Sequence, residues 1–411
     1  MPATFIDKDL SLSFITSKNE IEYSGIKYAF VDDINGNHIL KYSMGMSVLY
    51  APFFFTAHFL ATPLGYSQDG FSDIYQFFIE FSGLFYLIVG FWYLRKLLLL
   101  YFSENIVALT ILFVFFGTNL LYYSSIESAM SHAYTFSLFS VFLYYTFQFY
   151  NNSTYKISII LALLFGLIVL VRPLNCLFLF PFFLFNISSL KGLKIRFYFF
   201  VSHYRYMLVF IAVVSLVVLP QLIYYKYVTG HFFVFSYGTK EKFYFNNFHL
   251  VDVLFSFRKG WLIYTPIMFF SLYGIWLMRK VLVNTFSLVL LFFIPIYIYI
   301  ISCWWCWWYG GSFSQRSLID IYPLLSLSMA YVICEINKSL KIKKLVGYFL
   351  LTFFLTLNLF QTLQYKHNFI DYEAMTFKEY VNVFCSLNAS SVDTSLLIRP
   401  NYDRAVLGLT E

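Results

Sequence analysis

The chain has 411 residues, of which 60% are hydrophobic and only 12% are charged, and its mean hydropathy is +0.69. A soluble protein of this length cannot bury so much apolar surface, whereas several membrane spans of roughly 20 residues each account for it. The formal net charge of +7 comes from Lys and Arg scattered over many loops, which argues against nucleic acid as a partner. The composition therefore predicts an all-α, polytopic membrane protein.

Residues 1–43 are polar and rich in acids, and they include the adjacent carboxylates Asp32 and Asp33, followed by Lys41 and Tyr42. Paired carboxylates are suited to general-base catalysis or to binding a metal ion. Acids beside Asn and Gly are also common in solvated turns. The sequence leaves both interpretations open, and the identity of any metal is unknown.

The next segment, 44–62, is apolar but contains Pro52, so it predicts either a span or short helices lying in the membrane interface. Beyond it the pattern predicts about ten spans, in a transmembrane helical domain over residues 74–364. Residues 1–73 are then an outer-face loop with an interfacial helix, and 365–411 an outer-face tail. The predicted spans are 74–94, 106–123, 132–150, 157–172, 174–187, 207–226, 261–279, 285–302, 317–335 and 345–364.

Basic residues set the predicted orientation. Lys and Arg gather in the short loops around 95–96, 156, 188–206, 279–280 and 336–344, and such loops face the cytoplasm. The long 227–260 loop and the tail then face outward, as does the acidic N-terminal segment if 44–62 lies in the interface. If 44–62 spans the membrane, residues 1–43 lie inside. We expect a multi-pass membrane protein whose active face is extracytoplasmic.

Glu127 and His132 lie between two predicted spans, in the sequence SSIESAMSHAYTF. An acid and an imidazole at membrane depth are costly unless they face a cavity or each other. One interpretation is a satisfied pair at the start of the helix near Ser131. The other is a functional site at the mouth of the bundle.

Several cations interrupt apolar sequence on the predicted outer side. Arg172 follows a long apolar run and needs an anion or carbonyl oxygens around it. A phosphate can accept two hydrogen bonds from its guanidinium group. The alternative is that the side chain snorkels to the interface. Arg258 and Lys259, in a loop that also holds His249, precede a span on the side that usually lacks basic residues. They are expected either to bind a phosphate head group or to snorkel.

An aromatic cluster over Trp304–Tyr309, including Trp308, ends another apolar segment and is followed by Gly310 and Gly311. Trp and Tyr favour the membrane–water boundary, so the cluster is either an aromatic belt or the wall of a pocket for a lipid-borne anion. Arg316 and Asp320, four residues apart at the start of the next helix, could lie on one face, either as a local ion pair or as part of this anion pocket.

These elements, in order, resemble the bacterial polytopic glycosyltransferases of the GT-C fold, such as the protein mannosyltransferases and the lipid A aminoarabinose transferase. The resemblance rests on KYSMGMSVLYAPFF, MSHAYTFSLF, GLIVLVRPLN, FSFRKGWLIYTP and WWYGGSFSQRSLIDIYPLL, and it covers most of residues 28–335. It implies a cell-envelope transferase that passes a sugar from a polyprenyl-phosphate carrier to a lipid, glycan or protein acceptor. Its partners would be this carrier and membrane lipids.

The resemblance also implies roles for individual residues. Basic side chains neutralise the leaving lipid phosphate, and an acid of the first outer loop activates the acceptor or holds a divalent cation. No other cofactor is implied. The implied catalytic residues are Asp32, Asp33, Glu127 and His132, and the implied substrate-binding residues are Lys41, Tyr42, Arg172, His249, Arg258, Lys259, Trp304, Trp308, Tyr309, Arg316 and Asp320.

Such transferases begin with a transmembrane helix followed by their main catalytic acid, and no apolar span precedes residue 44. We therefore expect the sequence to be truncated at its N-terminus, and this chain to be inactive if the acid is lost with it.

The competing function is a polytopic transporter or lipid flippase without transferase chemistry, although no internal repeat is visible. A non-catalytic scaffold is a third interpretation.

Overall fold

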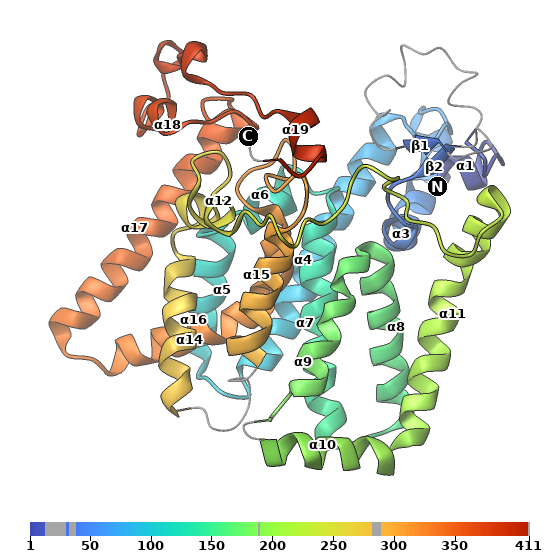
Figure 1. Ribbon diagram of the computed structural model, residues 1–411, viewed down its shortest axis with the longest axis horizontal. Helices are drawn as coiled ribbons and strands as arrows, with labels where there is room; N and C mark the ends of the chain where they lie inside the picture. The colour runs from blue at the N-terminus through green and yellow to red at the C-terminus, as the bar shows by residue number, and fades with distance from the viewer. Residues whose placement is uncertain (13–29, 33–37, 188–189, 282–288, 410–411) are drawn as a thin grey trace.

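The computed structural model describes residues 1–12, 30–32, 38–187, 190–281 and 289–409. Over these residues the chain forms a bundle of helices (Figure 1), and the strands described there, β1 (Phe30–Asp32) and β2 (His38–Leu40), pair as an antiparallel hairpin. The all-α prediction is confirmed for this part of the chain.

The first half of the chain combines long helices that run along the bundle with shorter helices near one of its ends (Figure 1). They are α1 (Pro2–Phe5), α3 (Gly45–Ala61) with the 3₁₀ turn η2 (Thr62–Leu64), α4 (Asp73–Leu98), α5 (Glu104–Phe116), α6 (Leu120–Ser125), α7 (Ser131–Asn151) and α8 (Tyr155–Val171).

The second half contains more breaks and short turns. Its elements are η3 (Pro173–Phe178), α9 (Leu179–Leu184), α10 (Leu190–Ser202), α11 (Tyr204–Thr229), α12 (Leu250–Phe255), α13 (Trp261–Tyr264), α14 (Met268–Val281), the π-helical η4 (Val289–Phe293), α15 (Ile294–Ser302), η5 (Arg316–Ile321), α16 (Tyr322–Lys338), α17 (Lys341–Lys366), α18 (Phe377–Val383), η6 (Ala389–Ser391), η7 (Thr394–Leu396) and α19 (Tyr402–Val406).

Five described segments are long and apolar enough to cross a membrane: Gly45–Leu64, Asp73–Leu98, Tyr204–Thr229, Arg316–Lys338 and Lys341–Lys366. Shorter apolar helices, such as α5 and α8, accompany them. The chain thus has the helices of a membrane protein, while the figure of about ten spans stays a prediction.

Some predicted spans are broken in the structure. The segment 106–123 divides into α5 and α6 because α5 ends at Gly117, which packs closely against Ile267. The segment 261–279 divides into α13 and α14 around Pro266, which has no N–H to continue a helix. Conversely, α3 runs through Pro52 as one helix rather than as two short ones.

The central helix of the bundle is α16. In the most apolar 18-residue stretch of Arg316–Lys338, 89% of the residues are buried inside the protein, whereas the corresponding share in Tyr204–Thr229 is 11%. Small residues allow this close packing, since a Cβ placed on Gly274 of α14 would lie 2.3 Å from the carbonyl oxygen of Ser328 in α16. Residues at the N-terminal end of this segment are therefore held firmly by their neighbours.

The two ends of the bundle differ. At one end, shown at the top of Figure 1, lie β1, β2, the loop after α11, α12, α18 and α19. This agrees with the prediction that the N-terminal segment, the 227–260 loop and the tail share a face; which side of the membrane they face stays a prediction. At the other end α10 lies crosswise, where the sequence predicted a loop, and it exposes Ile195, Phe197 and Tyr198.

The contact between α14 and α16 gives a first test. We expect Gly274→Val to lower stability by about 2 kcal/mol or more, because the added carbons meet backbone atoms of α16 that cannot move aside. The exposed neighbour Tyr273 supplies the control, Tyr273→Val. Thermal unfolding in detergent measures both, and equal melting temperatures would contradict the packing described here.

Candidate functional site

A buried carboxylate, Asp320, lies at the start of the central segment and gathers polar side chains around it. Arg172 Nη1 donates to Asp320 Oδ2 at 2.6 Å, and Asn175 Nδ2 donates to the same oxygen at 3.0 Å. The Tyr297 hydroxyl donates to Asn175 Oδ1 at 2.9 Å and lies 3.3 Å from Asp320 Oδ2. His132 Nδ1 lies 3.4 Å from Asp320 Oδ1. We call these five residues the Asp320 cluster.

The Asp320 cluster joins four separate parts of the chain. His132 comes from the first turn of α7, Tyr297 from α15 and Asp320 from η5. Pro173 ends α8 and leaves Arg172 extended, with φ −147° and ψ 106°, so that Nη2 also reaches the hydroxyl of Ser317 at 3.3 Å. The cluster therefore fixes the relative positions of these helices.

The predicted pair of Arg316 with Asp320 does not form. Both residues lie in η5, a 3₁₀ helix, whose three residues per turn place positions four apart on different faces. Asp320 pairs instead with Arg172, which the sequence had suggested as a phosphate ligand or a snorkelling residue. Because the Arg172 charge is offset by a fully buried carboxylate, we assign it to holding the fold.

Glu127 and Arg316 both contact Met130, and they form no ion pair with each other in the described part of the chain. The Tyr122 hydroxyl donates to Glu127 Oε1 at 2.9 Å, while Oε2 is buried with no hydrogen-bond partner among the described residues. Arg316 Nη2 donates to the Tyr309 carbonyl at 2.9 Å, and within the described ranges no carboxylate pairs with its guanidinium. Arg316 Nη1 contacts the sulfur of Met130, whose N–H donates to the Glu127 carbonyl at 3.0 Å. Glu127 therefore does not pair with His132.

The Trp turn, which we define as residues 304–311, folds into the protein. Trp307 is 5% exposed and Trp308 is fully buried, so these two rings do not form a lipid-facing belt. Tyr309 and Gly310 both adopt left-handed backbone, with φ of 57° and 66°, and this reverses the chain toward η5. The interpretation as a pocket wall fits these two tryptophans better.

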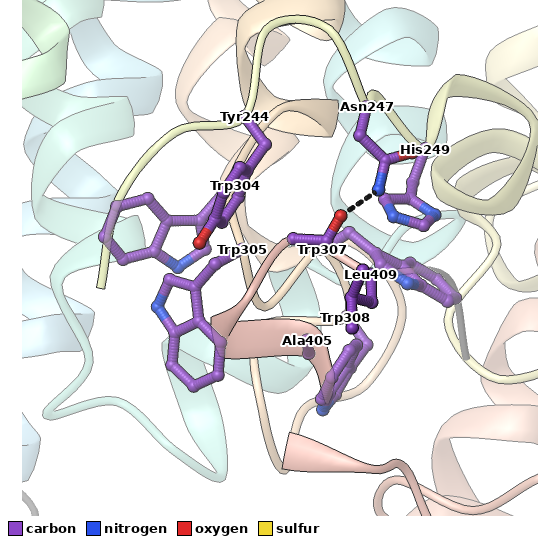
Figure 2. Close-up of a pocket in the computed structure, with 10 residues that line it drawn as sticks. Tyr244, Asn247, His249, Trp304, Trp305, Trp307, Trp308, Ala405 and Leu409 are labelled. Atoms are coloured by element: carbon purple, nitrogen blue, oxygen red, sulfur yellow. Dashed lines mark hydrogen bonds between the residues drawn. The ribbon is translucent and has the colours of Figure 1, made fainter. Parts of the chain in front are cut away.

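A small pocket lies against the Trp turn (Figure 2), lined by all four of its tryptophans. The His249 ring stacks on Trp307 with centroids 5.7 Å apart, and its Nδ1 lies 3.0 Å from Asp252 Oδ2. The Trp305 Nε1 is buried and has no hydrogen-bond partner in the described part of the chain. Aromatic faces next to polar groups suit a ligand with both apolar and hydroxyl surfaces.

The C-terminal segment 402–409 covers one side of this pocket. The Tyr402 ring packs edge-on against Trp308 at 5.3 Å, and Asn247 Nδ2 donates to the Gly408 carbonyl at 2.7 Å. Gly408 has φ 70° and lies close against the Tyr244 ring, so no larger residue fits there. The tail is therefore part of the pocket, and no local pattern of residues predicts this contact.

Arg258 and Lys259 have different surroundings. The Arg258 guanidinium lies 5.6 Å from the centre of the Trp308 ring, and Nη2 donates to the Ile398 carbonyl at 3.2 Å. Lys259 is 1% exposed, and its Nζ donates to the carbonyls of Ser312 and Tyr372. Burial lowers the pKa of Lys259 to about 7. Lys259 thus ties the chain after the Trp turn to the tail and does not snorkel.

The N-terminal candidates lie at the same end. Lys41 Nζ pairs with Glu241 Oε1 at 2.5 Å, and the Tyr42 ring packs edge-on against Tyr237, 6.4 Å away. The backbone of Asp32 pairs with His38 in the hairpin, and Asp33 lies outside the described residues. Across the described ranges, no three His, Cys, Asp or Glu side chains come together as metal ligands, and the divalent cation stays a prediction.

Sequence analysis missed several partners of these residues. Asn175 was visible as the polar residue three positions after Arg172, at a point where Pro173 ends a helix. Tyr297 carried no signal because it lies in an apolar run and is one of 36 tyrosines in the whole chain. The pairing of Lys41 with Glu241 joins positions 200 apart, which no local pattern predicts.

The buried pair gives a second test. We expect Asp320→Leu to cost about 3 kcal/mol of stability, because it leaves the Arg172 charge, on a side chain that is only 17% exposed, without its carboxylate partner. Thermal unfolding of the double variant Arg172→Met/Asp320→Leu should recover part of that loss. The exposed pair of Arg95 and Glu104 is the control, and Glu104→Gln should cost less than about 1 kcal/mol. A double variant no more stable than Asp320→Leu would contradict the assignment.

The lowered pKa of Lys259 gives a third test. Between pH 7 and the usual lysine pKa near 10.5, the unfolded chain carries a proton here that the folded chain lacks. The stability of the wild type relative to Lys259→Met should therefore rise with pH above 7, by at most about 1.4 kcal/mol per pH unit. Melting temperatures in detergent at pH 7, 8 and 9 measure this, and a flat difference would contradict it.

Comparisons with known proteins add no assignment to this geometry. No protein-family model, no curated protein and no solved structure matches the chain significantly. The functional conclusion therefore rests on the residues of the site.

Proposed function

We propose that the protein is a membrane glycosyltransferase that moves a sugar from a polyprenyl-phosphate carrier to a lipid, glycan or protein acceptor. One observation carries the proposal: among the described residues, neither the buried Glu127 Oε2 nor the Arg316 guanidinium beside the Trp turn has an ionic partner, and Met130 contacts both residues. Unpaired charges at a partly buried site are costly to stability and are often kept for function.

Arg316 is the best candidate for the carrier phosphate. Arg172 and Lys259, also considered for this role, already have partners in the protein, whereas the Arg316 guanidinium contacts a carbonyl and a methionine sulfur. Arg258, whose guanidinium lies 5.6 Å from the centre of the Trp308 ring, would add a second positive charge. Fixed positive charge in a site poor in water stabilises a departing phosphate.

Glu127 is the best candidate for the base. An acceptor hydroxyl would attack the anomeric carbon of the sugar, its proton would pass to Glu127 Oε2, and the bond from the sugar to the carrier phosphate would break. The lipid phosphate would leave against Arg316. The buried Oε2, which lacks a protein hydrogen bond in the described part of the chain, is the atom available for this proton.

The aromatic rings of the Trp turn would contact the sugar, and the small pocket beside them, with a volume of about 10 Å³, would have to widen to admit it. Sugar rings present C–H faces that pack on aromatic rings and hydroxyls that need hydrogen bonds. Trp304 and Trp305 offer ring surface, and His249 and Asn247 offer polar groups at the same pocket (Figure 2). This assignment of the phosphate, base and sugar roles agrees with the resemblance to GT-C glycosyltransferases and with an active face on the outer side of a bacterial inner membrane.

Reconstitution with a radiolabelled polyprenyl-phosphate sugar, and with bacterial membrane extract as the acceptor pool, tests the proposal. Label that moves to an acceptor supports a transferase, and Glu127→Gln should abolish this transfer while carrier binding persists. Label that crosses to the other leaflet without transfer would instead support the flippase. If the label neither moves to an acceptor nor crosses the membrane, the result would favour a scaffold and overturn the proposal.

Carrier binding gives the fourth prediction. We expect Arg316→Ala and Arg258→Ala each to weaken carrier affinity about tenfold or more, since a hydrogen bond to a charged group contributes about 1.5–3 kcal/mol. Lys343→Ala, at the start of α17 on the other end of the bundle, is the matched control and should leave affinity unchanged. Equal affinities in all three variants would refute the phosphate role.

A further inference from the structure

A second pocket lies at the end of the bundle opposite the Trp turn. It is formed where α4 and α7 end and α8 begins, and Lys96, Tyr144, Gln148, Lys156 and Ile157 are among the residues that line it. His132, at the other end of α7, belongs to the Asp320 cluster. A helix of 21 residues is about 31 Å long, so the two sites are separate.

We infer that this pocket binds the anionic head group of a phospholipid. The first reason is charge. Within the described ranges Lys96 and Lys156 have no carboxylate partner, whereas the neighbouring Arg95 is paired with Glu104 at 3.0 Å. Two ammonium groups in one pocket, with no acid to balance them, favour an anion.

The second reason is that the positive charge is held in a fixed position. The Lys96 ammonium is half-buried among aromatic rings, 5.0 Å from the centre of Tyr93, 5.5 Å from Trp92 and 5.8 Å from Tyr144. These rings hold the ammonium at the pocket wall. Lys156 lies in the first turn of α8, whose N-terminal backbone N–H groups add partial positive charge. The pocket thus presents fixed positive charge from two elements.

The third reason is the apolar surface above each lysine. On α4, Trp92 and Ile88 precede Lys96 by four and eight residues and are both 59% exposed. On α8, Ile159 and Leu163 follow Lys156 by three and seven residues and are also exposed. Residues at these spacings share one helical face, so an apolar stripe runs from each lysine toward the middle of the bundle. A phosphate at the lysines would leave acyl chains along these stripes.

The position in the fold agrees with a membrane surface. The crosswise helix α10 lies at this end (Figure 1) with exposed apolar side chains, as expected of a helix lying in the interface. The starts of α8 and α11 meet at the same level, where Ser158 Oγ donates to the Tyr206 carbonyl at 2.7 Å. The inference does not depend on the proposed transferase activity.

The test measures lipid binding to the full chain in neutral detergent by native mass spectrometry. We expect phosphatidylglycerol to bind more tightly than phosphatidylcholine, and Lys96→Gln and Lys156→Gln each to weaken phosphatidylglycerol about fivefold. The double variant should weaken it about 25-fold. Lys343→Gln/Lys344→Gln, which removes two exposed lysines at the same end, is the matched control and should change the affinity less than twofold.

Three outcomes would overturn the inference. Equal binding of the two lipids would remove the need for a negative head group, and an unchanged double variant would place the lipid elsewhere. Displacement of phosphatidylglycerol by millimolar inorganic phosphate would identify a site for the free ion instead. Lys156 is exposed, so Lys156→Gln is expected to fold and keeps the test decisive if Lys96→Gln does not.

Discussion

The pairing of Arg172 with Asp320 is the interaction on which the rest of the structure depends. Taking two charges out of water costs several kcal/mol each, and only a full set of hydrogen bonds offsets this cost. The fold supplies that set from α7, η3 and α15. Because Asp320 opens the central segment of the bundle, the same contacts set the position of η5 and of the Trp turn just before it.

Scarcity of charge makes each ionic side chain informative in this chain, since only 12% of its residues are charged. Those that the protein itself neutralises hold segments together, as Lys259 does between the residue after the Trp turn and the tail. Among the cations with no carboxylate partner in the described ranges, Arg316 lies at one end of the bundle and Lys96 and Lys156 at the other.

Composition and periodicity predicted the helical class and the grouping of the long loops at one end, because both follow from hydropathy and loop charge. They failed where a distant partner decides the outcome. Arg316 and Asp320 were expected to pair from their spacing, but the 3₁₀ geometry of η5 and the approach of Arg172 gave Asp320 another partner. Likewise, burial of Trp308 follows from the tail, whose contact with residues some 90 positions earlier leaves no trace in local sequence.

The packing of residues 402–409 over the Trp turn matters for anyone labelling the protein. A fluorescent fusion or affinity tag joined directly after Gly408 would pull on a segment that forms one side of a pocket. The turn between α16 and α17 offers a better attachment point, since Leu340 there is 76% exposed and lies at the opposite end of the bundle. A probe placed at that turn would report on the protein without disturbing the aromatic pocket.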